Sequence, residues 1–283
     1  MPSDAVSPDV AVPAALAEID RWQKGDLQFE SGAQRFARAV YILWYRELLR
    51  YFREPVNFWG SLIRPVLWLF VLGVGMGASM KTSSLGMPYA VYIFPGIITM
   101  SVLFTGLFQG VTMIFDREFG FLKEIMVAPV PTLAILLGKL FGGATLSLIQ
   151  GVIVLSFADL VPVHVHPANI PLILIVMFVM ALGTTAIGLL IAQRMTSFEG
   201  FGTIVNFLVF PLYFLSGSMF RPVGLPTWLQ TLVYIDPLAY GVDLFRWLIL
   251  GKGAFDFNLD LALLLGVSVV LVVINLVLFK RTT

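Results

Sequence analysis

The chain has 283 residues, of which 58% are hydrophobic and only 12% are charged, and its mean hydropathy is +0.90. Such a chain has too little polar surface to cover a water-soluble globule, so we expect an integral membrane protein. The 18 Lys and Arg residues nearly balance the 17 Asp and Glu residues, so no nucleic-acid partner is expected. The absence of cysteine excludes disulfides, thiolate metal sites and a cysteine nucleophile.

The first part of the chain is expected to lie on the cytoplasmic side. Residues 1–33 carry six acidic side chains and no long apolar run, which predicts a polar cytoplasmic tail and neither a signal nor a transit peptide. Residues 34–55 place apolar side chains at helical spacing and set Arg46, Arg50 and Arg53 on another face. This pattern predicts an amphipathic helix in the membrane interface, either a connecting helix or a simple juxtamembrane anchor.

Six apolar segments follow, each long enough to cross a bilayer as a helix of about 20 residues. They lie at about 58–78, 89–115, 130–158, 169–193, 200–220 and 259–279, within a transmembrane domain of residues 56–283. The first contains Arg64, whose long side chain can reach the headgroups from near the start of its helix. Six crossings put both termini on one side, and that side holds twelve of the eighteen Lys and Arg residues. The positive-inside rule therefore places both termini in the cytoplasm.

A segment between the fifth and sixth crossings does not fit a plain spanning helix. Residues 221–257 mix a short apolar stretch with prolines and charges, and the stretch is too short to cross. We expect re-entrant or surface helices here, forming an outer hairpin. Asp243 and Arg246 lie three residues apart on one helical face, so they either form an ion pair or rim the outer exit.

Glycine spacing and one lysine bear on how the helices pack. The pairs Gly106–Gly110 and Gly138–Gly142 are each four residues apart, a spacing that lets helix backbones approach closely. Lys139 lies early in the third crossing. A lysine at the bilayer centre costs about 2.5–3.5 kcal/mol, so we expect Lys139 to snorkel to the cytoplasmic interface or to pair there, for instance with the connecting helix.

The sequence offers little for catalysis. His164 and His166 stand in a short polar stretch without an accompanying carboxylate cluster, so a solvated loop is favoured over a metal site. An intramembrane serine protease would need a histidine at membrane depth beside Ser216 or Ser218, and neither histidine lies in a predicted crossing. No GxxxxGK[ST] motif occurs, so any ATP dependence must come from a partner. The chain itself is expected to be non-catalytic.

The turn between the second and third crossings, residues 116–128, mixes charged and apolar side chains before Pro129 and Pro131 end it. Two interpretations remain open. The segment is either a short docking helix, whose apolar residues fill a groove on a cytosolic partner while its charges fix the orientation, or a solvated charged turn.

Several stretches together carry a resemblance to a known family. The stretches that carry this resemblance follow the family's order along the chain and are residues 92–110, 115–130, 133–144 and 214–246. In them the chain resembles ABC-2 type transporter permeases, in the subgroup that includes daunorubicin-resistance and nodulation-factor export permeases. The resemblance covers most of residues 60–280. It implies an all-α, type V exporter-like membrane fold with six transmembrane helices, an interfacial helix at 34–55 and outer re-entrant helices.

The resemblance also implies a function and a set of partners. Such a permease forms a dimer, here expected to be a homodimer, in the bacterial cytoplasmic (inner) membrane, and it binds two copies of a separate ABC ATPase that holds ATP and Mg. It exports an amphipathic or lipid-linked substrate such as a drug, a glycolipid, a polysaccharide or a lipo-oligosaccharide. No cofactor or metal is expected on this chain.

Residue roles follow from the same resemblance. The coupling helix that docks on the ATPase falls on Asp116, Arg117, Glu118, Phe119, Leu122, Lys123 and Glu124. Breaks that let helices bend around a substrate path fall on Pro95, Gly96, Pro211 and Gly217, for which simple packing kinks are an equal alternative. The alternative function belongs to another class of membrane protein: an ATP-independent channel or lipid scramblase would use the same six crossings.

Overall fold

The computed structural model describes residues 32–79, 87–120, 131–195, 197–220 and 224–282. Within these ranges the chain forms helices and turns and no strand, so the predicted all-α fold is confirmed. The helices are α2 (Gly32–Arg53), α3 (Pro55–Ser79), α4 (Tyr89–Glu118), α6 (Thr132–Ser156), α7 (Ile170–Arg194), α8 (Phe198–Leu215), α9 (Thr227–Ile235), α10 (Pro237–Leu250) and α11 (Phe257–Thr282), with 3-10 turns η2 (Phe157–Leu160) and η3 (Pro167–Asn169).

Five segments of the described chain are long and apolar enough to cross a membrane. They are α4, α6 with η2, η3 with α7, α8, and Phe257–Phe279 of α11. A sixth results when α2 and α3, which meet at an angle of 71°, are counted as one bent crossing. The expected polytopic membrane protein is thus confirmed.

The bend between α2 and α3 has a local cause. Pro55 begins α3, and a proline disfavours the helical conformation of the residue before it, so Glu54 interrupts the helix. Side chains then hold the corner: the Tyr51 hydroxyl lies 2.7 Å from Oγ of Ser61, and Nε2 of Gln150 donates to the same Oγ at 2.7 Å. The corner is therefore tied to α6 as well.

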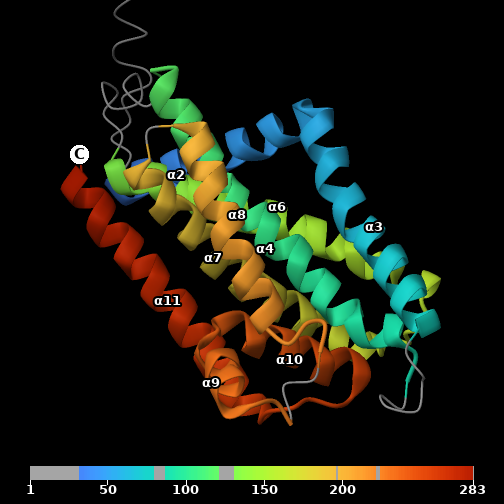
Figure 1. The fold of residues 1–283 in the computed structure, drawn as a ribbon. Helices are drawn as coiled ribbons and strands as arrows, with labels where there is room; N and C mark the ends of the chain where they lie inside the picture. Colours follow the sequence, from blue (N-terminus) through green and yellow to red (C-terminus); the bar gives the residue numbers. More distant parts are fainter. Residues whose placement is uncertain (1–31, 80–86, 121–130, 196, 221–223, 283) are drawn as a thin grey trace, which may run out of the picture.

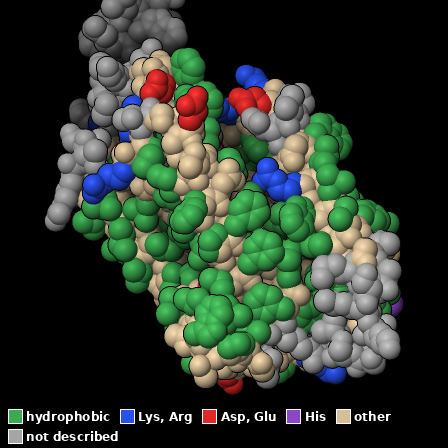
Figure 2. Space-filling view, in the orientation of Figure 1, with side chains coloured by type: hydrophobic (Ala, Val, Ile, Leu, Met, Phe, Trp, Pro, Cys, Tyr) green, Lys and Arg blue, Asp and Glu red, His purple; other side chains and the backbone are tan. Residues whose placement is uncertain are grey.

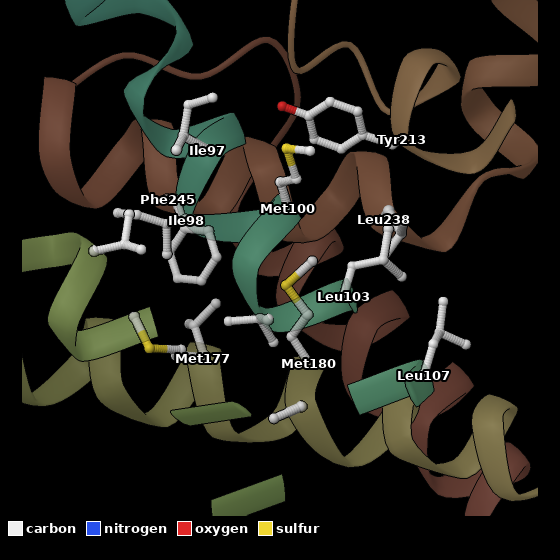
Figure 3. Packing of buried hydrophobic residues seen from close by; sticks show 14 of the residues in the cluster. Ile97, Ile98, Met100, Leu103, Leu107, Met177, Met180, Tyr213, Leu238 and Phe245 are labelled. Carbon is white, nitrogen blue, oxygen red and sulfur yellow. The ribbon is translucent and has the colours of Figure 1, made fainter. Parts of the chain in front are cut away.

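Helix α4 runs through the centre of the bundle (Figure 1). Of its most apolar 18-residue window, 83% is buried, against 17% for α11, because α4 packs against α3, α6, α7, α8 and α10. Figure 3 shows the core that results, with Met100 and Leu103 of α4 near Met180 of α7 and Phe245 of α10 nearby.

Close backbone contact joins α4 to α7, as the spacing of Gly106 and Gly110 suggests. A Cβ atom at Gly106 would lie 3.0 Å from the backbone nitrogen of Thr185, and one at Gly188 would lie 2.8 Å from Cα of Leu107. Only hydrogen fits at these positions, so the two helices touch through their backbones.

The two ends of the bundle differ. Helix α2 and the C-terminal end of α11 lie at one end, here called the α2 end, and α9 and α10 lie at the other (Figure 1). Hydrophobic side chains dominate the face between the ends, and charged side chains gather toward the α2 end (Figure 2). This distribution is that of a protein whose middle is surrounded by lipid.

Helices α9 and α10 occupy the segment for which an outer hairpin was expected. They have 9 and 14 residues and meet at Asp236, which caps α10 by accepting a hydrogen bond from the backbone N–H of Leu238 at 2.9 Å. Gly251 ends α10 in the left-handed region, with φ of 69°.

Candidate functional site

The amphipathic helix α2 is fixed along α6 by glycines. A Cβ atom at Gly138 would lie 2.5 Å from Cβ of Leu43, and one at Gly142 would lie 2.8 Å from Cβ of Glu47. Nε1 of Trp44 also donates a hydrogen bond to Oγ1 of Thr145 at 3.0 Å. The pair Gly138 and Gly142 therefore provides the groove into which α2 fits.

A buried ion cluster lies beside this groove. Glu47 of α2, Asp116 of α4 and Lys139 of α6 are each no more than 3% exposed. Nζ of Lys139 donates to Oε1 of Glu47 at 3.0 Å and also to Oδ2 of Asp116. One lysine thus bridges carboxylates that come from two other helices.

Further side chains complete the cluster. Arg46 and Arg50 donate to Oδ1 of Asp116 at 2.9 and 3.2 Å, and Nε2 of Gln109 donates to Oε2 of Glu47 at 3.1 Å. All four carboxylate oxygens therefore accept at least one hydrogen bond, which is the condition for keeping charges out of water. With three cations facing two carboxylates, the cluster joins α2, α4 and α6 at the α2 end.

Lys139 therefore pairs with the connecting helix, one of the two outcomes expected from the sequence. Its side chain is buried and does not extend to the surface in the single chain. The sequence did not identify Glu47 or Gln109 as members of the cluster, and it placed Asp116 in the docking segment.

The described part of the expected docking segment begins as the last turn of α4. Asp116 points into the ion cluster, whereas Arg117 donates to the backbone oxygens of Met195 and Gln193 at 3.1 and 3.4 Å. Glu118 and Phe119 are exposed, and 77% of Phe119 is accessible. The remaining expected contacts, Leu122, Lys123 and Glu124, lie outside the described residues.

The four residues expected at helix breaks do not gather at one place. Pro95 lies inside the continuous helix α4, and Pro211 lies inside α8 with its side chain exposed. Gly96 and Gly217 belong to one packed region, since a Cβ atom at Gly96 would lie 2.6 Å from Cβ of Ser218. Gly217 has φ of 71° and its oxygen accepts a hydrogen bond from Arg246.

Asp243 and Arg246, expected as an ion pair or an outer rim, are both buried in the single chain. Nη1 of Arg246 lies 4.0 Å from Oδ1 of Asp243, so they form the pair. The carboxylate of Asp243 also accepts hydrogen bonds from the backbone N–H groups of Ala254 and Phe255 at 2.8 and 2.9 Å. Asp243 therefore holds the turn after α10, and Arg246 holds the oxygen of Gly217.

His164 and His166 are exposed in the segment between η2 and α7. His166 caps the turn η3 by accepting a 3.4 Å hydrogen bond from Ala168 N. Among the described residues, no group of three or more His, Cys, Asp or Glu side chains is arranged to hold a metal ion.

The structure also contains a cavity that the sequence did not indicate. It has a volume of about 370 Å³ and lies between α2, α3 and α4, with Arg50 and Arg64 among its lining residues. Its α4 wall runs from Met100 to Phe115. The cavity is called the α2–α3–α4 cavity below.

Comparison with known proteins gives this geometry a family context. The model of the ABC-2 type transporter family matches residues 38–250. The putative transport permease ycf38 of Cyanophora paradoxa is 25% identical over 87% of this chain and 89% of its own length. The inner membrane transport permease YadH of Escherichia coli K12 is 28% identical over 83% of this chain and 90% of its own length.

A third relative supports the same assignment. Nodulation protein J of Rhizobium leguminosarum bv. viciae is 24% identical over 84% of this chain and 93% of its own length. The family match extends from α2 through α10 and so includes the ion cluster, the described docking residues and the α2–α3–α4 cavity. The chain belongs to the ABC-2 type transporter family and is a membrane transport permease.

Proposed function

We propose that this chain is the membrane subunit of an ATP-driven exporter, powered by a separate ABC ATPase that binds at the α2 end. Its cargo is an amphipathic or lipid-linked molecule that crosses the cytoplasmic membrane. In this proposal both termini are cytoplasmic, and two copies of the chain assemble with two ATPase subunits, which hold the ATP and Mg.

The observation that carries this proposal is the ion cluster next to the docking residues. Asp116, buried and bonded to Arg46 and Lys139, lies three residues before the exposed Phe119. A displacement of the α4 end by an ATPase would therefore act directly on α2 and α6 through short charged contacts. Such a connection is what a subunit needs if hydrolysis on a partner is to move its helices.

Phe119 is the described residue best suited to bind the ATPase. It is 77% exposed, and its ring stacks on Phe115 with centroids 5.8 Å apart, so it is held in place before binding. Exposed aromatic side chains with a fixed orientation are frequent anchors of protein interfaces. Phe119 would enter a groove on the ATPase, and the neighbouring charge of Glu118 would orient it.

A face of α8 supports assembly of two copies. Phe207, Phe210 and Phe214 are 82%, 47% and 39% exposed and follow each other at helical spacing. Because the chain contains no cysteine, the variant Phe207→Cys gives a single thiol. Cross-linking of this thiol to its symmetry mate in native membranes would support the homodimer, and cross-linking only to other proteins would contradict it.

The proposed function is tested by gentle solubilisation from native membranes followed by affinity purification. We expect a P-loop ATPase in equal number, released by Phe119→Ala and retained by Leu160→Ala. Leu160 is a matched control because it is also an exposed hydrophobic residue, 64% accessible, but lies in η2 beyond the far end of α6.

The result that would overturn the proposal is equally definite. If the purified chain brings no ATPase and moves substrate in vesicles without nucleotide, it acts as an ATP-independent channel or scramblase. ATP-dependent transport that requires the co-purified ATPase would support the exporter.

A further inference from the structure

We propose that the α2–α3–α4 cavity is a binding site for a phosphate-type anionic headgroup of an amphiphile, with Arg64 as the cation that holds it. One end of the cavity, at Arg50 and Phe115, adjoins the ion cluster and the docking residues, but the proposed binding at Arg64 does not require the ATPase. The shared chemistry is a phosphate group, carried either by a membrane lipid or by a free ion, and the experiment below distinguishes these sources.

The charges around the cavity leave one cation without a carboxylate. Glu47 is bonded to Lys139 and Gln109, and Oε1 of Glu54 lies 3.7 Å from Nε of Arg50. Among the described residues, Arg64 forms no ion pair. The cavity therefore has an uncompensated positive charge at Arg64.

The position of Arg64 makes this charge unusual. Arg64 lies nine residues after Pro55, or about 14 Å along α3 at 1.5 Å per residue, within the apolar stretch Phe58–Gly73. Its guanidinium carbon lies over the ring of Phe104, 4.3 Å from the centroid. Arg64 is exposed in the single chain, so in a bilayer its guanidinium would face lipid or a headgroup. A cation–π contact offsets only part of the cost of placing an arginine in lipid, so an anionic ligand would be favoured here.

A second group in the cavity also has an unused hydrogen-bonding capacity. Ser101 lines the cavity and is 3% exposed, and its hydroxyl has no hydrogen-bond partner among the described residues. Ser101 and Phe104 are three residues apart on α4, so the hydroxyl and the ring beneath Arg64 share one face of the helix. A phosphate oxygen can accept from Ser101, and another can accept from the guanidinium fork of Arg64.

The surroundings favour an amphiphile over a water-soluble ion. The rings of Phe104 and Phe108 form an apolar wall, stacked with centroids 6.2 Å apart. On α3, Ile63 and Leu67, which flank Arg64, are 53% and 56% exposed. A volume of about 370 Å³ leaves room for the first carbons of a chain beside the headgroup, and it falls within the usual size of ligand pockets.

The test uses the purified chain without ATPase or nucleotide. The delipidated protein is titrated with phosphatidylglycerol or phosphatidylcholine, and bound lipid is counted by native mass spectrometry. We expect preferential retention of phosphatidylglycerol and a loss of about tenfold in its affinity in Arg64→Gln, the amount typical of one charge-assisted contact. Arg53→Gln is the matched control, because Arg53 is an exposed arginine at the end of α2 that does not line the cavity.

A second variant tests the cavity without removing the charge. A Cβ atom at Gly60, which lines the cavity, would meet no atom within 4 Å, so Gly60→Leu can be accommodated and would occupy part of the volume. We expect it to weaken phosphatidylglycerol binding while the elution volume and thermal midpoint stay those of the wild type. Because the two variants act through different properties, misfolding of one leaves the other as a valid test.

Competition identifies the source of the phosphate. Dodecyl phosphate should displace bound phosphatidylglycerol, and inorganic phosphate at the same concentration should not. Equal displacement by inorganic phosphate would overturn the amphiphile assignment. Equal binding of both lipids would overturn the site, and this result is also expected if a second copy of the chain fills the cavity. Unchanged binding in Arg64→Gln would overturn it as well.

Discussion

Nζ of Lys139 on α6 lies 3.0 Å from Oε1 of Glu47 on α2, and both side chains are buried. The same lysine contacts Asp116 at the end of α4, so one amino group joins three helices. Burying these charges is tolerated because each carboxylate oxygen has a donor. Removing Lys139 would take away the only fully buried cation among the cluster's described residues and leave the carboxylates with the half-buried Arg46 and Arg50.

The first prediction concerns this lysine. Lys139→Met should lower the free energy of unfolding by up to about 3 kcal/mol, less than the ~3–5 kcal/mol of an ion left wholly unpaired, because Arg46 and Arg50 still contact the carboxylates. The measurement is the thermal or denaturant midpoint of the purified protein in detergent. Lys252→Met, at an exposed lysine after α10, should leave the midpoint unchanged.

A double variant separates the pair from the lysine alone. Glu47→Gln combined with Lys139→Met should lose less stability than the sum of the two single variants, because neither partner is then left charged on its own. Additive losses would show that Lys139 and Glu47 are not coupled and would contradict the cluster.

The second prediction concerns the groove under α2. Gly142→Ala should destabilise the protein by about 1–3 kcal/mol, since the new methyl group would lie 2.8 Å from Cβ of Glu47 and overpack the contact. Gly266→Ala on α11 is the control, because its Cβ atom would meet nothing within 4 Å. That change should be neutral or stabilising by up to about 1 kcal/mol, as alanine favours a helix over glycine. Equal effects at both positions would contradict the close α2–α6 contact.

The third prediction concerns pH. Burial raises the pKa of Asp236, which lies between α9 and α10 outside the membrane-spanning helices, to about 7, and the hydrogen bond from Leu238 N opposes this only in part. The carboxyl is therefore protonated in the folded protein at low pH. Its contribution to stability is fully present below the unfolded pKa near 3.8 and is lost as pH rises through about 7.

Thermal midpoints measured between pH 5 and pH 8.5 check this sign. The wild type should lose stability across the range, and Asp236→Asn, which keeps an oxygen to cap α10, should lose less. Asp256→Asn is the matched control, because Asp256 caps α11 through Asn258 N but is exposed. An unchanged pH profile in Asp236→Asn would assign the dependence to other groups.

The fourth prediction concerns the docking residues. Glu118→Lys should weaken ATPase binding about fivefold without changing the thermal midpoint, because an exposed charge at an interface rim contributes about 1 kcal/mol or less. Asp159→Lys, at an exposed carboxylate in η2 beyond the far end of α6, controls for the change in net charge. Equal weakening by both variants would show that only overall charge matters and would contradict a specific contact at Glu118.

The lengths of the apolar segments predicted the helical membrane fold, because a bilayer requires long apolar helices and each segment shows its length by itself. The helix α2 was also predictable from the helical spacing of its apolar side chains and of Arg46, Arg50 and Arg53, but the contact of Arg46 and Arg50 with Asp116 was not. The spacing of Gly138 and Gly142 indicated close packing but could not say which helix lies there. The partner, α2, is about 95 residues earlier in the chain, a distance that local patterns do not encode.

The ion cluster was only partly predictable for the same reason. A lysine in an apolar segment costs free energy to place in a bilayer, so the sequence predicted that Lys139 snorkels or pairs, with the connecting helix as one partner. Asp116 was interpreted as part of the docking segment, because its neighbours Arg117 and Glu118 are charged. The direction in which a side chain points at a helix end depends on the helix phase, so the sequence did not distinguish Asp116, which faces inward, from Phe119, which faces outward.

The close contact at Gly138 and Gly142 has one further consequence. Gly138 and Gly142 have no side chain to separate the two helices, and Lys139 lies between them in the sequence. A shift of α2 along α6 by one residue would therefore separate Glu47 from Lys139 and leave a buried charge without its partner. The two helices therefore move as one rigid body, and the hinge of any conformational change must lie elsewhere in the molecule.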